Sequence, residues 1–373
     1  MEKNDFAGIF VYLLMLVLAF VVGQTVISIA QKEVVEYLSS MSFIGYVVIC
    51  IAASSLLYTI IYELGHIIGA HIGGYSVTLV NIFFLCWYKD QGKAKFGFRV
   101  FDGLLSEFKC APKENKKGKP FCFLFGGILL YIISAVVSVI VAALVSYPPI
   151  RWACLIYLGI SLILLLYHIM PMQLDTINDG YRIKLLLGNR KNVAAFNEFM
   201  RVEETLSRGL VPTNIQLYED ISPMTILVNQ YALYEVYQAG DEEKAESIVE
   251  MYLENKEKIS SQLYLRFLAK KMRYLLMFRP LEEAKEFYWK QLSTQERKFM
   301  ENDNHLDTQL AYFLISGLIN ESVSECRIAL SHYQPLMKKC KYVVQKEVEE
   351  KQYKEAKQKV LEVLKDADFD EFL

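Results

Sequence analysis

The sequence predicts an all-α fold in two parts, a polytopic membrane helical core followed by a soluble α-helical domain. Of the 373 residues, 53% are hydrophobic, and these concentrate in the first half of the chain. The second half is charged and rich in helix-forming residues. Because an α-helix needs about 20 apolar residues to cross a bilayer, the long apolar runs of the first half predict membrane-spanning helices. We expect a membrane domain over residues 1–184 and a cytosolic domain over residues 185–373.

Apolar stretches long enough to span a bilayer lie at roughly residues 6–30, 41–61, 121–146 and 150–170. The first begins with acidic residues and lacks a small-x-small cleavage site. We therefore interpret it as a retained anchor and not as a secretion signal. A further apolar stretch, Val77 to Tyr88, is too short to span, and we expect a short membrane-associated hairpin there.

Loop charges predict the orientation of these spans. Lysines and one arginine crowd the segment 89–119, whereas the segment 31–40 is net acidic. Positive charge near membrane ends stays cytoplasmic. We expect an integral membrane protein, in the plasma membrane of a bacterium, with its N-terminus and C-terminal domain in the cytoplasm. The net charge of −2 gives no indication of nucleic-acid binding.

The stretch "IYELGHIIGAHIGGY", residues 61–75, contains most of a metal-binding helix motif. In His-Glu-x-x-His, two ligands stand one turn apart and the glutamate is the general base. Glu63 and His66 stand at their places, but Tyr62 stands where the first histidine belongs. The second and fourth predicted spans run in the same direction, so Asp179 emerges at the same membrane face as Glu63. Ionisable residues at membrane depth are functional candidates.

Together with two later motifs, this stretch resembles the site-2 protease family of intramembrane zinc proteases. The later motifs are "FLFGGILLYII" at 123–133 and "NDG" at 178–180, and the resemblance covers roughly residues 45–185. It implies cleavage of transmembrane or membrane-adjacent peptides in the lipid bilayer. It also implies that Zn2+ is held by His66 and Asp179, with Glu63 as the general base.

The departure at Tyr62 leaves alternatives open. A phenol has a pKa near 10 and binds zinc well only when the metal deprotonates it. The segment "HIMP" places His168 where the family often has asparagine, so either Tyr62 or His168 could complete the metal site. Their simpler interpretations are a helix-packed tyrosine and an interfacial histidine. The alternative function is a catalytically inactive homologue that acts as a membrane scaffold or peptide-binding protein.

The second half shows a period of 39 residues, because Ala245, Ala284 and Val323 occupy equivalent places in similar helical stretches. A fixed period is typical of stacked helical pairs. The stretch 231–255, with its Gly-Asp turn between amphipathic helices, resembles a tetratricopeptide hairpin, although the period exceeds the usual one. Such stacks offer a concave surface to a protein partner. The alternative is an irregular helical bundle without a partner.

The seven cysteines are scattered, and none forms a Cys-x-x-Cys pair. This spacing predicts neither a disulfide framework nor a zinc knuckle.

Overall fold

The computed structural model describes residues 3–37, 40–90, 93–98, 106–113, 117–171, 178–340 and 343–369. The chain divides into unit 1, Met1–Glu204, and unit 2, Thr205–Leu373. Residues 185–204, which the sequence places in the second domain, pack with unit 1 instead. Two contacts hold them there: the Lys109 ammonium lies 2.8 Å from Glu203, and the Asn197 amide donates to the Gly118 carbonyl at 2.9 Å.

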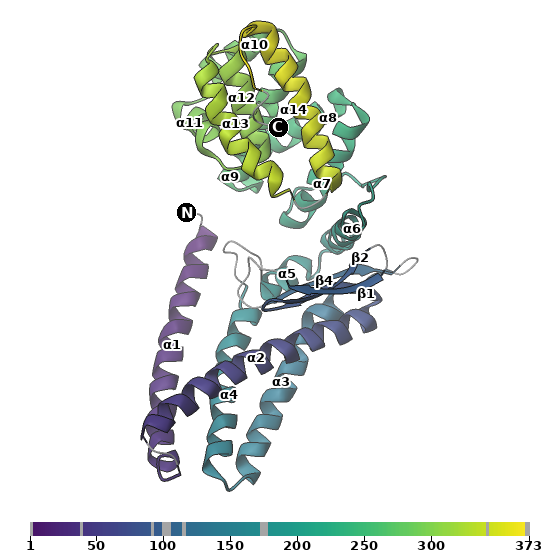
Figure 1. Cartoon of the computed structure of the whole chain (residues 1–373). Helices are drawn as coiled ribbons and strands as arrows, with labels where there is room; N and C mark the ends of the chain where they lie inside the picture. The colour runs from purple at the N-terminus through teal and green to yellow at the C-terminus, as the bar shows by residue number, and fades with distance from the viewer. Residues whose placement is uncertain are drawn as a thin grey trace. The chain divides into compact units, whose positions relative to one another are not determined.

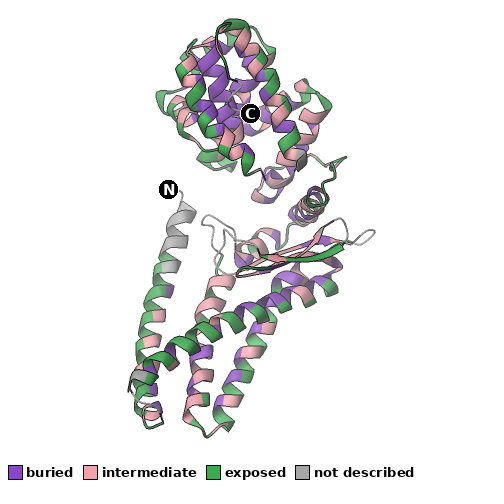
Figure 2. Ribbon diagram, in the orientation of Figure 1, coloured by how far each residue is buried: buried purple, intermediate pink, exposed green. Residues whose placement is uncertain are grey.

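Among its described residues, unit 1 contains four helices that are long and apolar enough to cross a membrane, at the places where the sequence predicts spans. They are α1 (Lys3–Val34), α2 (Ser40–Gly73), α3 (Pro120–Leu144) and α4 (Pro148–Ile169). Figure 2 shows many exposed residues along these helices, and a large share of them are apolar. A helix that is apolar on all sides and exposed needs lipid around it. Two shorter helices follow, α5 (Asp179–Leu186) and α6 (Arg190–Ser207).

Between α2 and α3 the chain forms a four-stranded antiparallel sheet, so the all-α expectation is wrong for this segment. The strands are β1 (Tyr75–Ile82), β2 (Leu85–Asp90), β3 (Lys93–Phe98) and β4 (Ser106–Pro112), in the order β3-β2-β1-β4. The expected hairpin at 77–88 corresponds to β1 and β2. It acquires two more strands because a lone hairpin is only marginally stable. Figure 1 shows the sheet over the C-terminal end of α2.

Glycines bring the backbones of α2 and α3 into direct contact. A Cβ atom added at Gly69 would lie 2.2 Å from the Cys122 carbonyl oxygen, and one at Gly65 would lie 2.4 Å from that of Gly126. At Gly127, the space of the missing Cβ is bordered by the His66 imidazole, 2.9 Å away. Small residues permit such close packing of membrane helices. The contact therefore fixes α3 against the part of α2 that carries the predicted motif.

Gly69→Ala is expected to push α2 away from α3 and destabilise unit 1 by about 1–3 kcal/mol, the usual cost of overpacking. Gly45→Ala, in the same helix, is the matched control because nothing lies within 4 Å of its Cβ position. Hydrogen–deuterium exchange in detergent micelles measures the difference. Faster exchange across α2 and α3 should appear only in Gly69→Ala, and equal exchange in both variants would contradict the close contact.

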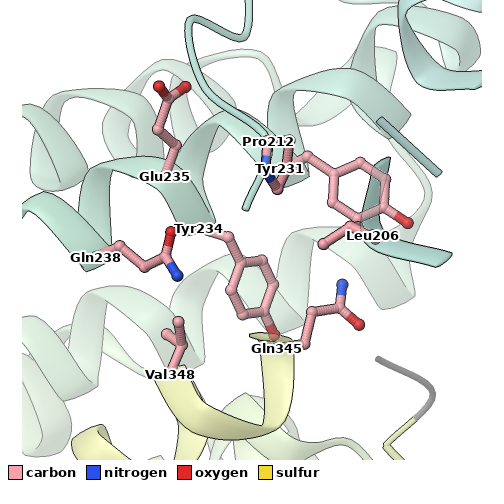
Figure 3. Close-up of a pocket in the computed structure, with 8 residues that line it drawn as sticks. All are labelled: Leu206, Pro212, Tyr231, Tyr234, Glu235, Gln238, Gln345 and Val348. Carbon is pink, nitrogen blue, oxygen red and sulfur yellow. The ribbon is translucent and has the colours of Figure 1, made fainter. Parts of the chain in front are cut away.

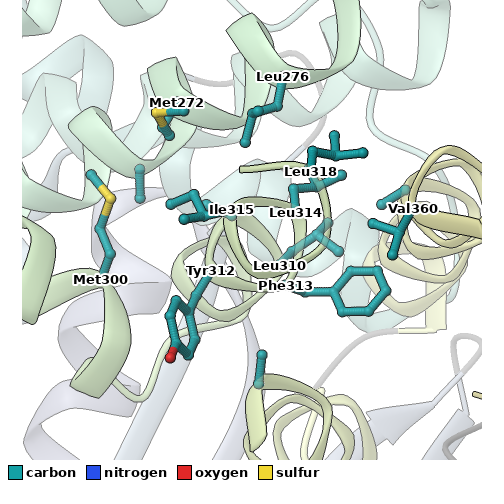
Figure 4. Packing of buried hydrophobic residues seen from close by; sticks show 14 of the residues in the cluster. Met272, Leu276, Met300, Leu310, Tyr312, Phe313, Leu314, Ile315, Leu318 and Val360 are labelled. Atoms are coloured by element: carbon teal, nitrogen blue, oxygen red, sulfur yellow. The ribbon is translucent and has the colours of Figure 1, made fainter. Parts of the chain in front are cut away.

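The secondary-structure elements of unit 2 are all helices among its described residues, which confirms the helical character predicted for the second half (Figure 1). Its α-helices are α7 (Pro223–Ala239), α8 (Glu242–Glu254), α9 (Ser261–Phe278), α10 (Leu281–Glu286), α11 (Thr294–Asn302), α12 (Leu306–Leu318), α13 (Val323–Lys338) and α14 (Val343–Val363). Every residue of α12 after Leu306 is buried, and its apolar side chains form the centre of the core (Figure 4).

Two of the three residues that define the 39-residue period are buried. Ala245 of α8 and Ala284 of α10 are at most 1% exposed, whereas Val323, the first residue of α13, is only partly buried. The helices that carry them differ in length, however: α8 has 13 residues, whereas α10 has 6 and continues into a π-helical turn at Phe287–Gln291. The tetratricopeptide-like repeat stays a prediction.

Four buried charges link the helices of unit 2. Asp307 of α12 pairs with Lys270 and with Arg273, whose guanidinium lies 3.3 Å from its carboxylate. Glu349 of α14 accepts a hydrogen bond from the Tyr234 hydroxyl of α7 at 2.6 Å. Burial, followed by the negative charge of Asp307, raises the pKa of Glu349 to about 7. Near neutral pH this side chain therefore changes between its acid and its carboxylate.

The raised pKa of Glu349 makes unit 2 sensitive to pH. Its folded pKa of about 7 exceeds the ordinary 4.5, so its protonation stabilises the fold at low pH. That stabilisation is lost as the pH rises through 7. We expect the stability of the wild type to fall between pH 5 and 8, and Glu349→Gln should remove most of this fall. At pH 8 the variant should be more stable than the wild type by on the order of 1–3 kcal/mol. Circular dichroism melts measure it, with the exposed Glu347→Gln of the same helix as control. The same pH slope in Glu349→Gln as in wild type would contradict the assignment.

Candidate functional site

The C-terminal turns of α2 carry the candidate residues into a buried position. Tyr62, Glu63 and His66 are only 4%, 3% and 4% exposed. Tyr62 and His66 are four residues apart and therefore share one face of the helix. Their rings meet edge to face, with centroids 4.5 Å apart. The predicted motif thus forms one compact group of side chains.

A backbone carbonyl of α3 orients the His66 ring. His66 Nδ1 lies 2.8 Å from the carbonyl oxygen of Phe123. Because a carbonyl only accepts hydrogen bonds, Nδ1 must carry the proton. The other nitrogen, Nε2, lies 3.3 Å from Asp179 Oδ2. In a neutral imidazole this nitrogen offers a lone pair to an oxygen that cannot donate, so a proton or a cation is required between them.

The Asn-Asp-Gly motif positions Asp179 at the start of α5. Asn178 caps the helix by accepting from the Tyr181 backbone N–H at 3.0 Å, and its amide donates to the Met170 carbonyl at 2.7 Å. Gly180 lies so close to the end of α4 that a Cβ atom there would be 2.2 Å from the Ile169 carbonyl oxygen. Each residue of the motif therefore has its own role in bringing Asp179 under α4.

The Asp179 carboxylate is the centre of the group. The Tyr62 hydroxyl donates to Oδ2, the oxygen that also faces His66, and the Arg182 guanidinium lies 3.3 Å from Oδ1. Burial alone would raise the pKa of Asp179. The hydrogen bond and charge of His66, with the charge of Arg182, outweigh it and hold the pKa well below its usual range. Asp179 is therefore an anion at neutral pH.

Glu63 has one satisfied and one unsatisfied oxygen. Its Oε1 accepts a hydrogen bond from the Ser106 hydroxyl of β4. Its Oε2 is buried and has no hydrogen-bond partner among the described residues. An unpaired buried oxygen of this kind costs about 1–3 kcal/mol. A water molecule or a bound ligand would satisfy it.

His168 supports the site through its ring. Its centroid lies 4.0 Å from that of Tyr62 and 6.0 Å from that of Tyr58. Among the described residues, no cluster of three or more His, Cys, Asp and Glu side chains is arranged to hold a metal ion. The two candidates for a third ligand differ in their contacts. Tyr62 touches the carboxylate of Asp179, whereas His168 packs on the ring of Tyr62.

One distance at Asp179 is compatible with a zinc ion. Two ligand atoms about 2.0–2.1 Å from one tetrahedral zinc lie about 3.3–3.4 Å apart. The 3.3 Å between His66 Nε2 and Asp179 Oδ2 agrees with this separation. A backbone carbonyl on the other nitrogen of a histidine is a frequent feature around metal ligands. The Tyr62 hydroxyl is instead hydrogen-bonded directly to the same oxygen of Asp179, and the unpaired oxygen of Glu63 belongs to the residue next to Tyr62 in sequence.

Several contacts of this site carry no signal in the sequence. Ser106 and Phe108 come from β4, and the Phe108 ring stacks on His66 with centroids 5.3 Å apart. Arg182 stands one turn beyond Asp179 on α5, where an acidic and a basic residue three apart are common on any helix. The Asn-Asp-Gly motif alone does not distinguish this arginine, because only the fold shows that the Asp179 carboxylate is buried.

Unit 2 contains a small pocket lined by Leu206, Pro212, Tyr231, Tyr234, Glu235, Gln238, Gln345 and Val348 (Figure 3). The carboxylate of Glu235 already accepts the backbone N–H groups of Asn214 and Ile215, at 2.6 and 2.9 Å. The Tyr234 hydroxyl is bound to Glu349. Its main polar groups therefore serve the fold, and the group at Asp179 is the stronger candidate.

Comparison of the chain with models of protein families, with curated proteins and with solved structures finds no match. The function must therefore be argued from the geometry and chemistry of the site itself.

Tyr62→Phe is expected to destabilise unit 1 by about 1–3 kcal/mol, because it removes a donor from the buried Asp179 carboxylate. Tyr58→Phe is the matched control: Tyr58 lies one turn earlier, is 2% exposed, and its hydroxyl has no partner among the described residues. The unfolding temperatures of the two variants are compared in detergent, with thiol labelling of the buried Cys50 as the readout of unfolding. If Tyr58→Phe costs as much as Tyr62→Phe, the hydroxyl of Tyr62 has no special role.

Proposed function

We propose that this chain is an intramembrane zinc endopeptidase with an altered ligand set. The observation that carries the proposal is that Tyr62 and His66 both meet the same carboxylate oxygen of Asp179, beside Glu63. Tyr62, His66 and Asp179 would hold Zn2+. When bound, the ion would lower the pKa of a water molecule and polarise a peptide carbonyl. A phenol binds zinc less readily than imidazole, so the affinity should be lower than at a site with two histidines.

The residues of the chain prepare the site for peptide hydrolysis. Ser106 holds one oxygen of Glu63, which leaves the other, buried and unpaired, to accept a proton from water as a general base. The Phe123 carbonyl fixes the tautomer of His66 and leaves its Nε2 free as a ligand. His66, and after it the guanidinium of Arg182, lower the pKa of Asp179 against the effect of burial and keep it ionised. Contacts of this kind hold the reacting groups in place, which limits the reorganisation that catalysis requires.

The substrate that suits this site is a transmembrane or membrane-adjacent peptide. Glu63 and His66 lie within the apolar part of α2 that is long enough to cross the bilayer. The basic segment 89–119 supports a cytoplasmic position for the site, the N-terminus and unit 2. Arg99 and Lys116 of that segment lie outside the described residues. We place the protein in a bacterial plasma membrane, and the helices of unit 2 would receive a protein partner.

A second candidate function is a non-catalytic membrane scaffold or peptide-binding protein. The observation that favours it is that the Tyr62 hydroxyl and the Arg182 guanidinium satisfy both oxygens of Asp179 without a metal ion. A charged His66 would then provide the proton needed between Nε2 and Asp179. In that case the free oxygen of Glu63 would accept a peptide N–H group, and the peptide would be held without being cleaved.

Metal content separates the two functions. We expect about one equivalent of zinc in the purified wild type, as in catalytic sites with three protein ligands. His66→Ala and Asp179→Asn should lose it, Tyr62→Phe should hold it more weakly, and Tyr58→Phe should retain it. Tyr62→His should bind zinc more tightly, because it creates the two-histidine spacing of zinc-binding helices. Elemental analysis after dialysis measures each protein. A wild type without zinc favours the scaffold.

Hydrolysis tests the role of Glu63 independently of the metal. Glu63→Gln should retain zinc but lose cleavage of a hydrophobic transmembrane peptide in liposomes, measured by mass spectrometry of new peptide ends. General-base catalysis contributes about 10²–10⁴-fold, so the residual rate should be small. His168→Ala is the comparison for the other proposed ligand. Unchanged zinc content in that variant excludes His168 as a ligand.

A further inference from the structure

The sheet of unit 1 has one face on which aligned side chains run across all four strands. Residues directly opposite each other in neighbouring strands point to the same face. Phe98 of β3 is opposite Leu85 of β2, Leu85 is opposite Ile82 of β1, and Ile82 is opposite Ser106 of β4. A second row runs in parallel from Phe96 through Trp87 and Val80 to Phe108. We call these two lines of side chains the aromatic rows.

The inner ends of the aromatic rows lie at the candidate site. Ser106, the end of the first row, donates its hydroxyl hydrogen bond to Glu63. Phe108, the end of the second row, stacks on the His66 ring. Glu63 and His66 belong to α2. The face of the sheet that carries Ser106 and Phe108 is therefore the one turned toward the membrane helices.

The outer ends of the aromatic rows are uncovered. Phe96 and Phe98 are each 83% exposed, and Leu85 is 56% exposed. Phe84, in the turn between β1 and β2, is 60% exposed and stacks on Phe98 with ring centroids 6.0 Å apart. Exposed apolar residues that stand alone are common, but a contiguous group of this kind marks an interaction surface.

The position of the sheet identifies lipid as the occupant. The apolar, membrane-length part of α2 extends to Ile72, and β1 begins at Tyr75. Ile68 and Ile72 are 51% and 72% exposed, so the last turns of α2 still present an apolar surface. The sheet therefore starts where the membrane span ends. Its apolar face is turned toward the membrane helices, and aromatic residues favour the interface between hydrocarbon and water.

The other face of β3 has the opposite character. Strand alternation places Lys93 and Lys95 there, and both are exposed. One strand thus presents aromatic rings on the side of the membrane helices and ammonium groups on the other side. This is the arrangement of an amphipathic element that lies in the membrane surface.

We propose that the outer ends of the aromatic rows, with Phe84, rest in the headgroup and upper acyl-chain region of the bilayer. The occupant of this surface is lipid, not a protein or peptide. The sheet then sets the depth at which Ser106 and Phe108 present themselves to Glu63 and His66. This inference goes beyond the proposed function, because it holds for a peptidase and for a scaffold alike.

Tryptophan quenching in lipid nanodiscs tests the proposal on the full chain. Phe96→Trp and Lys95→Trp are a matched pair, adjacent in β3 but on opposite faces, and wild type supplies the background from its own tryptophans. With phosphatidylcholine brominated on its acyl chains, the fluorescence added by Phe96→Trp should fall at least about twofold, and that added by Lys95→Trp should not change. Iodide in the buffer should quench the fluorescence added by Lys95→Trp and leave that added by Phe96→Trp unchanged.

Two other outcomes would overturn the proposal. Quenching of Phe96→Trp by iodide alone would place this face in water. Protection of Phe96→Trp from both bromine and iodide would mean that a protein surface, such as a second copy of the chain, covers it. Elution of both variants at the wild-type volume in size-exclusion chromatography checks that they are folded. Neither outcome bears on zinc binding, so the proposed function is tested separately.

Discussion

The direct backbone contact between α2 and α3 is the constraint on which the rest of unit 1 depends. Because glycines stand at 65, 69, 126 and 127, the two helices approach until a Cβ atom would collide with a carbonyl oxygen. This proximity delivers the Phe123 carbonyl to His66 Nδ1. The direction of the other imidazole nitrogen, and hence its meeting with Asp179, follows from that one hydrogen bond. Helices held apart by larger residues would leave His66 without an orienting partner.

A second consequence of this packing is electrostatic. Taking a carboxylate out of water is costly unless charges and hydrogen bonds replace the lost hydration. Asp179 meets this requirement with donors from α2 and α5, whereas Glu63 meets it at only one oxygen. The site therefore combines a fully compensated anion with a carboxylate that still lacks a partner. A difference of this kind between the partners of two buried carboxylates is expected where one carboxylate stabilises the structure and its neighbour performs chemistry.

The predictions from sequence succeeded where a single segment carries its own signal. The four membrane-length helices follow from uninterrupted apolar runs, and the helical second half follows from amphipathic patterning. The sheet was only partly anticipated: the hairpin of β1 and β2 lies at the expected place, but β3 and β4 were missed. The segment "KAKFGF" of β3 is short and carries lysines, and it is a strand only because β2 offers it an edge. Pairing with a neighbouring strand leaves little trace in the sequence of a short segment.

The sequence by itself determined which residues belong to the candidate site, because Glu63, His66 and Asp179 stand in motifs at the ends of membrane spans. It also showed that Tyr62 replaces a histidine. Only the tertiary structure showed that the Tyr62 hydroxyl contacts Asp179 while His168 packs on the Tyr62 ring, since the first of these contacts joins residues 117 positions apart. It alone brought in Ser106, Phe108 and Arg182. The physical reason is that side-chain distances between helices are set by packing, and the spacing along one chain does not contain them.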